Sequence, residues 1–231
     1  MNRVEQQRAY ILKSQSFKET SFIHQIFTRD YGIVSVVSRG SKAKTSKTGS
    51  LLQPFRELSI SWSGKTELKT LTNVEQRGHA ELLKGDALYC GFYVNELVLN
   101  LLHKYDSHPV LFDSFQRVIK GLLSTQNIEV SLRQFELSLL EEIGYGLQLE
   151  SVGTHLEAIQ SEKNYKYIIG QGVEEVLLPV KGDVITGATL KNLRDNCLVN
   201  KVELKQAKRL MRRLIDHQLD GKILKSRELF L

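Results

Sequence analysis

The sequence has 231 residues, 41% of them apolar, which is enough to bury the core of one large domain or of two or three small ones. Its two cysteines, Cys90 and Cys197, form no CxxC pair, which argues against a disulfide framework and a cysteine-based zinc site. No apolar run approaches the roughly 18 residues that cross a bilayer, and the start MNRVEQQRAY lacks a signal peptide's apolar core, so we expect a cytoplasmic protein with no membrane partner.

Charge is unevenly distributed along the chain. The 32 basic and 26 acidic residues give a net charge of +6. Residues 1–80 carry 13 basic and 6 acidic side chains, residues 81–180 carry 7 and 14, and residues 181–231 carry 12 and 6. Two basic ends that flank an acidic middle indicate polyanion binding by the ends, although the pattern also fits ordinary variation of surface charge.

Short strands are predicted in the first part of the chain. The clearest contains Leu58, Ile60 and Trp62, which alternate with serines and so share one buried face. The predicted strands are 10–13, 22–28, 33–37, 58–62 and 68–74. Five short strands with one longer polar connection predict an OB-fold β-barrel at residues 1–80, and an SH3-like barrel fits the strand count almost as well.

Helical periodicity replaces this alternation in the rest of the chain. Apolar residues recur there at 3.6-residue spacing, which predicts a mainly α-helical domain at 81–231 and an α+β fold overall. Asp86 is expected to cap the first helix, and Pro109 to occupy the first turn of the second. A third helix is predicted over 130–143, with Gly144 at its end.

The helical pattern is interrupted once. Four glycines and a strand-like run at 165–169 predict an irregular insertion or a hairpin at 145–180. Helices are then expected over 187–193, capped by Thr186, and over 202–219.

The segment RGSKAKTSKTGS at 39–50 lies between two predicted strands. It has four basic residues, two glycines and no apolar anchor, so we expect it to stay solvated and to present positive charge outward. A nucleic-acid backbone is the expected target. The candidate DNA contacts in this basic loop are Arg39, Lys42, Lys44 and Lys47.

The last predicted helix is amphipathic, with apolar residues on one arc and cations on the other. Such a row of cations can follow a phosphate backbone. An alternative fits equally well, in which this is a solvated face whose charges pair with the acidic middle of the chain. The cations are Lys205, Lys208, Arg209, Arg212 and Arg213.

Three aromatic residues near the basic loop are candidates for base stacking. Single-strand binders combine a basic groove with exposed rings. Trp62 alternates with serines and is expected in the core, whereas Tyr31 and Phe55 lie at strand ends, where either role is possible.

Motifs of catalysis are missing from the sequence. It contains no HExxH, GxxxxGK[ST], GxGxxG or GxSxG pattern, and its six histidines are scattered. The paired carboxylates Glu141–Glu142 and Glu174–Glu175 diverge on a helix and are expected on the surface. We therefore expect no catalytic residue, metal or cofactor, and we rank a nuclease as a distant alternative.

Blocks throughout the chain resemble the RecO family of bacterial recombination mediators. The blocks are ILKSQSFKETSFIHQIFTRDYGIVSVVSRGSKAK, LLQPFRELSISWSGKTELKTL, YCGFYVNELVLNLL, LRQFELSLLEEIGYG and AKRLMRRLIDHQLDGKILKSREL. The resemblance implies an OB-fold joined to a helical domain, and a DNA-repair protein that is not an enzyme. It further implies binding of single- and double-stranded DNA, annealing of complementary strands coated by the single-stranded-DNA-binding protein SSB, loading of RecA together with RecR, and association with the nucleoid.

The resemblance also implies roles for particular residues. The four cations of the basic loop and Arg56, which follows QPF, match the family's OB-fold DNA surface. Arg133, at the start of RQFEL, falls where a cation could meet the acidic C-terminal tail of SSB. An alternative interpretation is an interaction scaffold that binds acidic protein tails, with DNA binding secondary.

The chain departs from many family members after GYG. Those members have cysteine pairs there that bind zinc, whereas this chain reads GYGLQLESVGTHLEAIQSEKNYKY without cysteine. No metal is therefore expected, and the segment must hold its shape by packing or stay mobile.

Overall fold

The computed structural model describes residues 3–78, 82–124, 127–153, 157–177 and 183–230 of the chain. It contains two compact units, which are treated separately below. The first unit is Met1–Thr125 together with Leu224–Leu231, and the second is Gln126–Ile223. The predicted domain boundary at 80/81 and parts of the predicted insertion, 154–156 and 178–180, lie outside the described residues.

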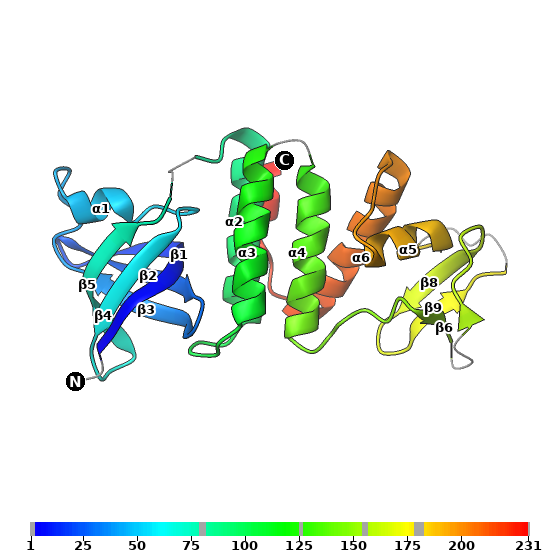
Figure 1. The fold of residues 1–231 in the computed structure, drawn as a ribbon, viewed down its shortest axis with the longest axis horizontal. Coiled ribbons are helices and arrows are strands. Elements are labelled where there is room, and N and C mark those ends of the chain that lie inside the picture. Colours follow the sequence, from blue (N-terminus) through cyan, green and yellow to red (C-terminus); the bar gives the residue numbers. More distant parts are fainter. Residues whose placement is uncertain (1–2, 79–81, 125–126, 154–156, 178–182, 231) are drawn as a thin grey trace. The chain divides into compact units, whose positions relative to one another are not determined.

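A closed five-stranded barrel forms the start of the first unit (Figure 1). Its strands are β1 (Arg3–Phe17), β2 (Ser21–Thr28), β3 (Gly32–Ser38), β4 (Leu58–Ser63) and β5 (Leu68–Gln76). They follow the order β1-β2-β3-β5-β4, and β1 pairs with β4 to close the barrel. Neighbouring strands are antiparallel except for the parallel pair β3–β5. The OB-fold prediction is confirmed.

The barrel core forms on the face that the alternating pattern predicted. Leu58, Ile60 and Trp62 are at most 2% exposed and belong to one apolar cluster with residues of β1, β2 and β3. Trp62 is therefore a core residue, as expected. The connection from β3 to β4 contains a short helix, α1 (Lys47–Leu51), that the sequence did not predict.

Two long helices and one short helix complete the first unit. They are α2 (Gly85–Leu101), α3 (Pro109–Ser124) and the 3-10 helix η1 (Lys225–Phe230). Phe112 of α3 packs on Tyr10 and Phe27 of the barrel, with ring centroids 5.6 and 5.4 Å apart. Pro109 opens α3 as predicted. The prediction that Asp86 caps α2 is wrong, because the N-cap is Lys84 and Asp86 lies in the first turn.

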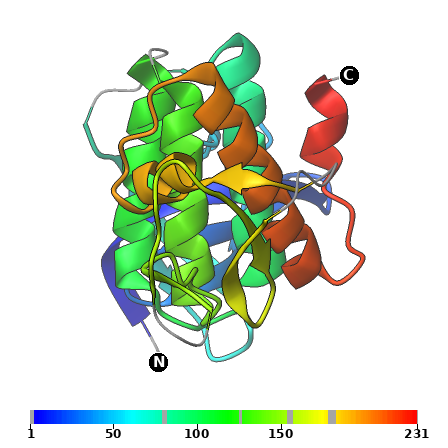
Figure 2. The ribbon, with the colours of Figure 1, turned by 90° about the vertical axis from the view of Figure 1, so that its right-hand side faces the viewer.

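The second unit joins three helices to a small sheet, which Figure 2 shows with the yellow β8–β9 hairpin and the orange α6 toward the viewer. The helices are α4 (Ile128–Glu142), α5 (Gly187–Arg194) and α6 (Lys201–Leu219). The strands are β6 (Ser151–Val152), β7 (Glu157–Ala158), β8 (Asn164–Ile168), β9 (Gly172–Glu175) and β10 (Ile185–Thr186). The predicted hairpin is β8–β9, and the cap at Thr186 is confirmed, since its hydroxyl accepts the Thr189 N–H at 3.3 Å. The two-residue strands were not predicted.

Packing holds this sheet on the helices. Tyr165, Tyr167 and Val173 of the hairpin are buried in one apolar cluster with residues of α4, α5 and α6. Among the described residues, no helix is long and apolar enough to cross a membrane.

Candidate nucleic-acid interface

The basic loop is ordered at its base, contrary to the prediction that it is merely solvated. Ser41 is 4% exposed, and its hydroxyl lies 2.6 Å from the Ser38 hydroxyl and donates to the Ser38 carbonyl at 2.9 Å. A Cβ atom at Gly49 would lie 2.1 Å from the Ser41 carbonyl oxygen, so only glycine allows α1 to approach this closely. The Ser46 hydroxyl caps α1 by accepting the Gly49 N–H at 3.1 Å. Hydrogen bonds of the Ser41 and Ser46 hydroxyl groups therefore hold the base of the loop, where the sequence has no apolar residue to anchor it.

A buried histidine extends this anchor into the barrel. His24 of β2 is 2% exposed, and its Nε2 lies 2.8 Å from the Ser38 hydroxyl while its Nδ1 lies 2.8 Å from the Ser14 hydroxyl. Burial lowers the pKa of His24 to about 4, so the ring is neutral at pH 7. The chain Ser14–His24–Ser38–Ser41, here called the His24 network, links β1, β2, β3 and the basic loop.

The basic loop also meets the turn between β1 and β2. The Lys42 ammonium group donates to the Lys18 carbonyl at 2.6 Å, and the Lys42 N–H donates to the Thr20 carbonyl at 3.2 Å. The same ammonium group lies 5.5 Å from the Phe22 ring centroid, and that of Lys18 lies 5.5 Å from the ring of Phe17. Cations and half-buried aromatic rings therefore meet at this end of the barrel, in the combination that single-strand binders use.

Sequence reasoning missed Phe17, Lys18 and Phe22. Antiparallel pairing puts Ser16 opposite Phe22 and Phe17 opposite Ser21, so the two rings lie on opposite faces of the hairpin. The available signal was a pair of aromatic residues around the charged turn KET, within reach of a basic loop.

The predicted cations of the basic loop differ in solvent exposure and in their contacts. Arg39, Lys44 and Lys47 are exposed and form no ion pair with another described residue. Lys42 is half-buried by the contacts above. Arg56 is half-buried and donates to the Ser50 carbonyl at 3.2 Å, so it holds the chain beyond α1. The five predicted cations thus belong to a single β3–β4 connection, and three of them project into solvent.

The predicted stacking aromatics have different surroundings. Phe55 is 9% exposed and packs on Phe92 with ring centroids 5.3 Å apart, so it belongs to the core. Tyr31 is 41% exposed and lies edge-on to Trp62 at 5.5 Å. Of the three, only Tyr31 presents a ring to solvent.

The cations of α6 are mostly engaged within the second unit. Lys208 lies 3.3 Å from Glu129, and Arg209 donates to the Val184 carbonyl at 2.6 Å. Arg213 lies 2.8 Å from Asp183 and also donates to the Tyr167 carbonyl. Lys205 and Arg212 are exposed and have no ion pair with another described residue. Two of the five predicted cations therefore keep a free charge.

Arg133 lies on α4 and is only 5% exposed. Its Nη2 donates to the Glu136 carboxylate at 2.6 Å. Its Nε and Nη1 form no hydrogen bond within the described part of the chain. The N–H groups of these two nitrogens are therefore buried without an acceptor in the described part of the chain.

Metal ligands do not converge in the part of the chain that the structure describes. No three His, Cys, Asp or Glu side chains there are grouped as a metal site. The segment after GYG is held by the packing of Tyr165 and Tyr167 described above.

Family comparisons cover almost the whole chain. The model "Recombination protein O N terminal" matches residues 1–78, and "Recombination protein O C terminal" matches residues 82–228. The chain is 42% identical over 229 residues to the DNA repair protein RecO of Methylococcus capsulatus, covering 99% of this chain and 94% of that protein. It is 37% identical to the proteins of the same name from Azoarcus sp. and from Halorhodospira halophila, which it covers by 94% and 98%. The chain therefore belongs to the RecO family.

Proposed function

We propose that this protein is a recombination mediator in DNA repair, and that it binds single- and double-stranded DNA through the basic loop. Membership of the RecO family supports a role in repair and recombination without enzymatic chemistry. The observation that carries the proposal is the anchored basic loop, with its free cations beside the aromatic β1–β2 turn.

The geometry of the basic loop suits a polyanion. Its base is fixed by the His24 network, so the backbone there loses less entropy on binding than the backbone of an unanchored loop would. Arg39, Lys44 and Lys47 are exposed and have no carboxylate partner among the described residues, so contact with phosphates breaks no internal ion pair. Phe17 and Phe22, on opposite faces of the β1–β2 hairpin, each offer one half-buried ring to an unstacked base.

A second, smaller surface lies on α6. Lys205 and Arg212 are free there, whereas Lys208, Arg209 and Arg213 contact acceptors within the unit. Annealing brings two polyanions together, so a protein that screens one strand at each of two surfaces lowers their repulsion. We assign annealing of complementary SSB-coated strands to these two surfaces.

The proposed protein partners are SSB, RecR and, through RecR, RecA. For SSB, Arg133 is proposed from the family resemblance. Its Nε and Nη1 are buried, so a carboxylate of the acidic tail reaches them only when the side chain is uncovered. RecR and RecA are proposed from the family resemblance alone.

The decisive experiment is equilibrium binding of labelled single-stranded DNA across a salt series. Lys44→Glu combined with Lys47→Glu reverses two free charges and spares Lys42, which has a structural contact. If each lysine contacts one phosphate, the slope of log K against log salt falls by about 1.4 on single strands. The control is Lys84→Glu with Lys120→Glu, two exposed lysines elsewhere in the first unit, which should leave the slope near that of the parent.

Two results would contradict the proposal. Weak binding that is insensitive to salt and to both double variants would show that the basic loop does not bind DNA. If an acidic peptide then bound tightly, and lost affinity when its terminal residues were removed, the protein would be a scaffold for acidic tails.

A further inference from the structure

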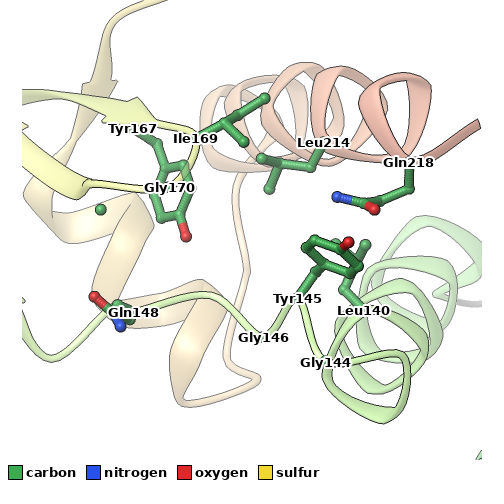
Figure 3. Close-up of a pocket in the computed structure, with 11 residues that line it drawn as sticks. Leu140, Gly144, Tyr145, Gly146, Gln148, Tyr167, Ile169, Gly170, Leu214 and Gln218 are labelled. Carbon is green, nitrogen blue, oxygen red and sulfur yellow. The ribbon is translucent and has the colours of Figure 1, made fainter. Parts of the chain in front are cut away.

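A pocket of about 170 Å³ lies within the second unit (Figure 3). It is formed by the end of α4 with the following Gly144–Gly146 turn, by the β8–β9 turn and by the last turns of α6. Figure 3 shows Tyr145 and Gln218 on one side of the opening, and Tyr167 and Gln148 on the other. None of the described residues that line it carries a charge.

The pocket has an apolar floor and an aromatic wall. Leu140 and Leu214 are 1% and 6% exposed, so the floor is rigid core. Gly144 has a φ of 85°, which ends α4 and turns the chain toward Tyr145. Tyr145 is 57% exposed, although its backbone N–H donates a 2.7 Å hydrogen bond to the Leu140 carbonyl. An exposed ring on a fixed backbone is a ready surface for stacking.

Polar groups in the pocket are neutral. Burial raises the pKa of Tyr167, which keeps its hydroxyl protonated, and the backbone N–H of Gln148 donates to that hydroxyl. The side-chain amides of Gln148 and Gln218 form no hydrogen bond with another described residue. Each amide offers donors and an acceptor, as does the edge of a nucleobase.

The size of the pocket restricts its occupant. Pockets that bind drug-sized ligands measure about 300–1,000 Å³, so a pocket of about 170 Å³ takes a single ring-sized group. A flat neutral group with mixed donors and acceptors fits both the ring and the amides. A terminal carboxylate of an acidic peptide would need a cation, and no described lining residue supplies one.

We propose that this pocket receives one unstacked base of a single-stranded nucleic acid whose backbone follows the free cations of α6. Arg212 is exposed and precedes Gln218 by six residues, which places it about 9 Å along α6 and about 120° around it, so the backbone must pass around the helix between the cations and the pocket. The inference rests on the proposed function, because it adds base contacts to the phosphate contacts of the α6 surface.

The test compares two labelled oligonucleotides of equal length and charge, oligo-dT and its abasic analogue. Tyr145→Ala should weaken binding of oligo-dT by about 5- to 150-fold and leave abasic DNA within about twofold. Tyr145→Phe keeps the ring and should bind oligo-dT like the parent. Gln148→Ala combined with Gln218→Ala should weaken the binding of oligo-dT more than the binding of the abasic analogue. Thermal unfolding verifies that each variant folds.

Photocrosslinking locates the base directly. Oligo-dT that carries 5-iodouracil should crosslink to the peptide containing Tyr145. If Tyr145→Ala leaves oligo-dT binding unchanged while Lys44→Glu with Lys47→Glu still weakens it, the pocket proposal is overturned and the proposed function stands. If neither variant weakens binding, both fail. If Tyr145→Ala impairs only the binding of a peptide with an aromatic C-terminus, the occupant is a peptide and the proposal is wrong.

Discussion

The ammonium group of Lys42 donates a hydrogen bond of 2.6 Å to the backbone carbonyl of Lys18. This contact joins the basic loop to the β1–β2 turn, two segments that are 24 residues apart in the sequence. Lys42 therefore has a structural contact as well as a charge, whereas Lys44 is exposed and has no such contact among the described residues. The two lysines should respond differently to the same substitution.

Replacing Lys42 with methionine should loosen the basic loop before any DNA is added. Methionine keeps the length of the side chain but cannot donate to the Lys18 carbonyl. Hydrogen exchange of residues 39–46 should become faster in Lys42→Met and stay at the parent rate in Lys44→Met. Both variants should bind single-stranded DNA less tightly, with the larger loss in Lys42→Met. Equal exchange rates in the two variants would show that the contact does not order the loop.

Acidification should destabilise the protein through His24. Its pKa is about 4 in the folded protein and 6.5 in the unfolded chain. Between these pH values the unfolded chain binds more protons, so this contribution is fully present above pH 6.5 and is lost as the pH falls toward 4. As the pH falls from 6.5 to 4, the free energy of unfolding should decrease less in His24→Gln than in the parent, by at most about 3 kcal/mol. Parallel urea titrations of parent and variant measure the difference, and parallel pH curves would contradict it.

The barrel could be predicted because its signal is local. Leu58, Ile60 and Trp62 alternate with serines over five residues, and this alternation is what places them in the core. Order in the basic loop could not be predicted in this way. It depends on His24, which precedes Ser41 by 17 residues and is linked to it through the Ser38 hydroxyl, a neighbour that the pairing of β2 with β3 brings within hydrogen-bond distance.

The candidate site shows the same division between local patterns, which the sequence reveals, and long-range contacts, which it does not. Exposed cations of the basic loop could be found from composition, and Arg39 and Lys44 are indeed exposed. The helical arc of α6 was also predictable, but which cations stay free depends on distant acceptors such as Asp183 and Glu129. The pocket at Tyr145 joins three segments that no sequence pattern relates.

Arg212 and Arg213 are neighbours on α6 that should have separate roles. Arg213 contacts Asp183 at 2.8 Å and the Tyr167 carbonyl, so Arg213→Ala should lower the free energy of unfolding by about 1 kcal/mol. Arg212→Ala should leave stability within about 0.5 kcal/mol and weaken DNA binding at low salt. Urea unfolding and DNA titration of the two variants side by side test this, and a reversed pattern would refute the assignment.

Glu96 of α2 should hold η1 in place. Its carboxylate accepts the N–H groups of Lys225 and Ser226, each at 2.9 Å, and the Ser226 hydroxyl at 2.6 Å. Hydrogen bonds to a charged acceptor are strong, so Glu96→Ala should lower the free energy of unfolding by about 2 kcal/mol and speed hydrogen exchange at 225–229. Glu228→Ala, at an exposed position of η1 itself, is the control and should change neither. If exchange at 225–229 were the same in Glu96→Ala and the parent, the carboxylate would not be what retains this segment on α2.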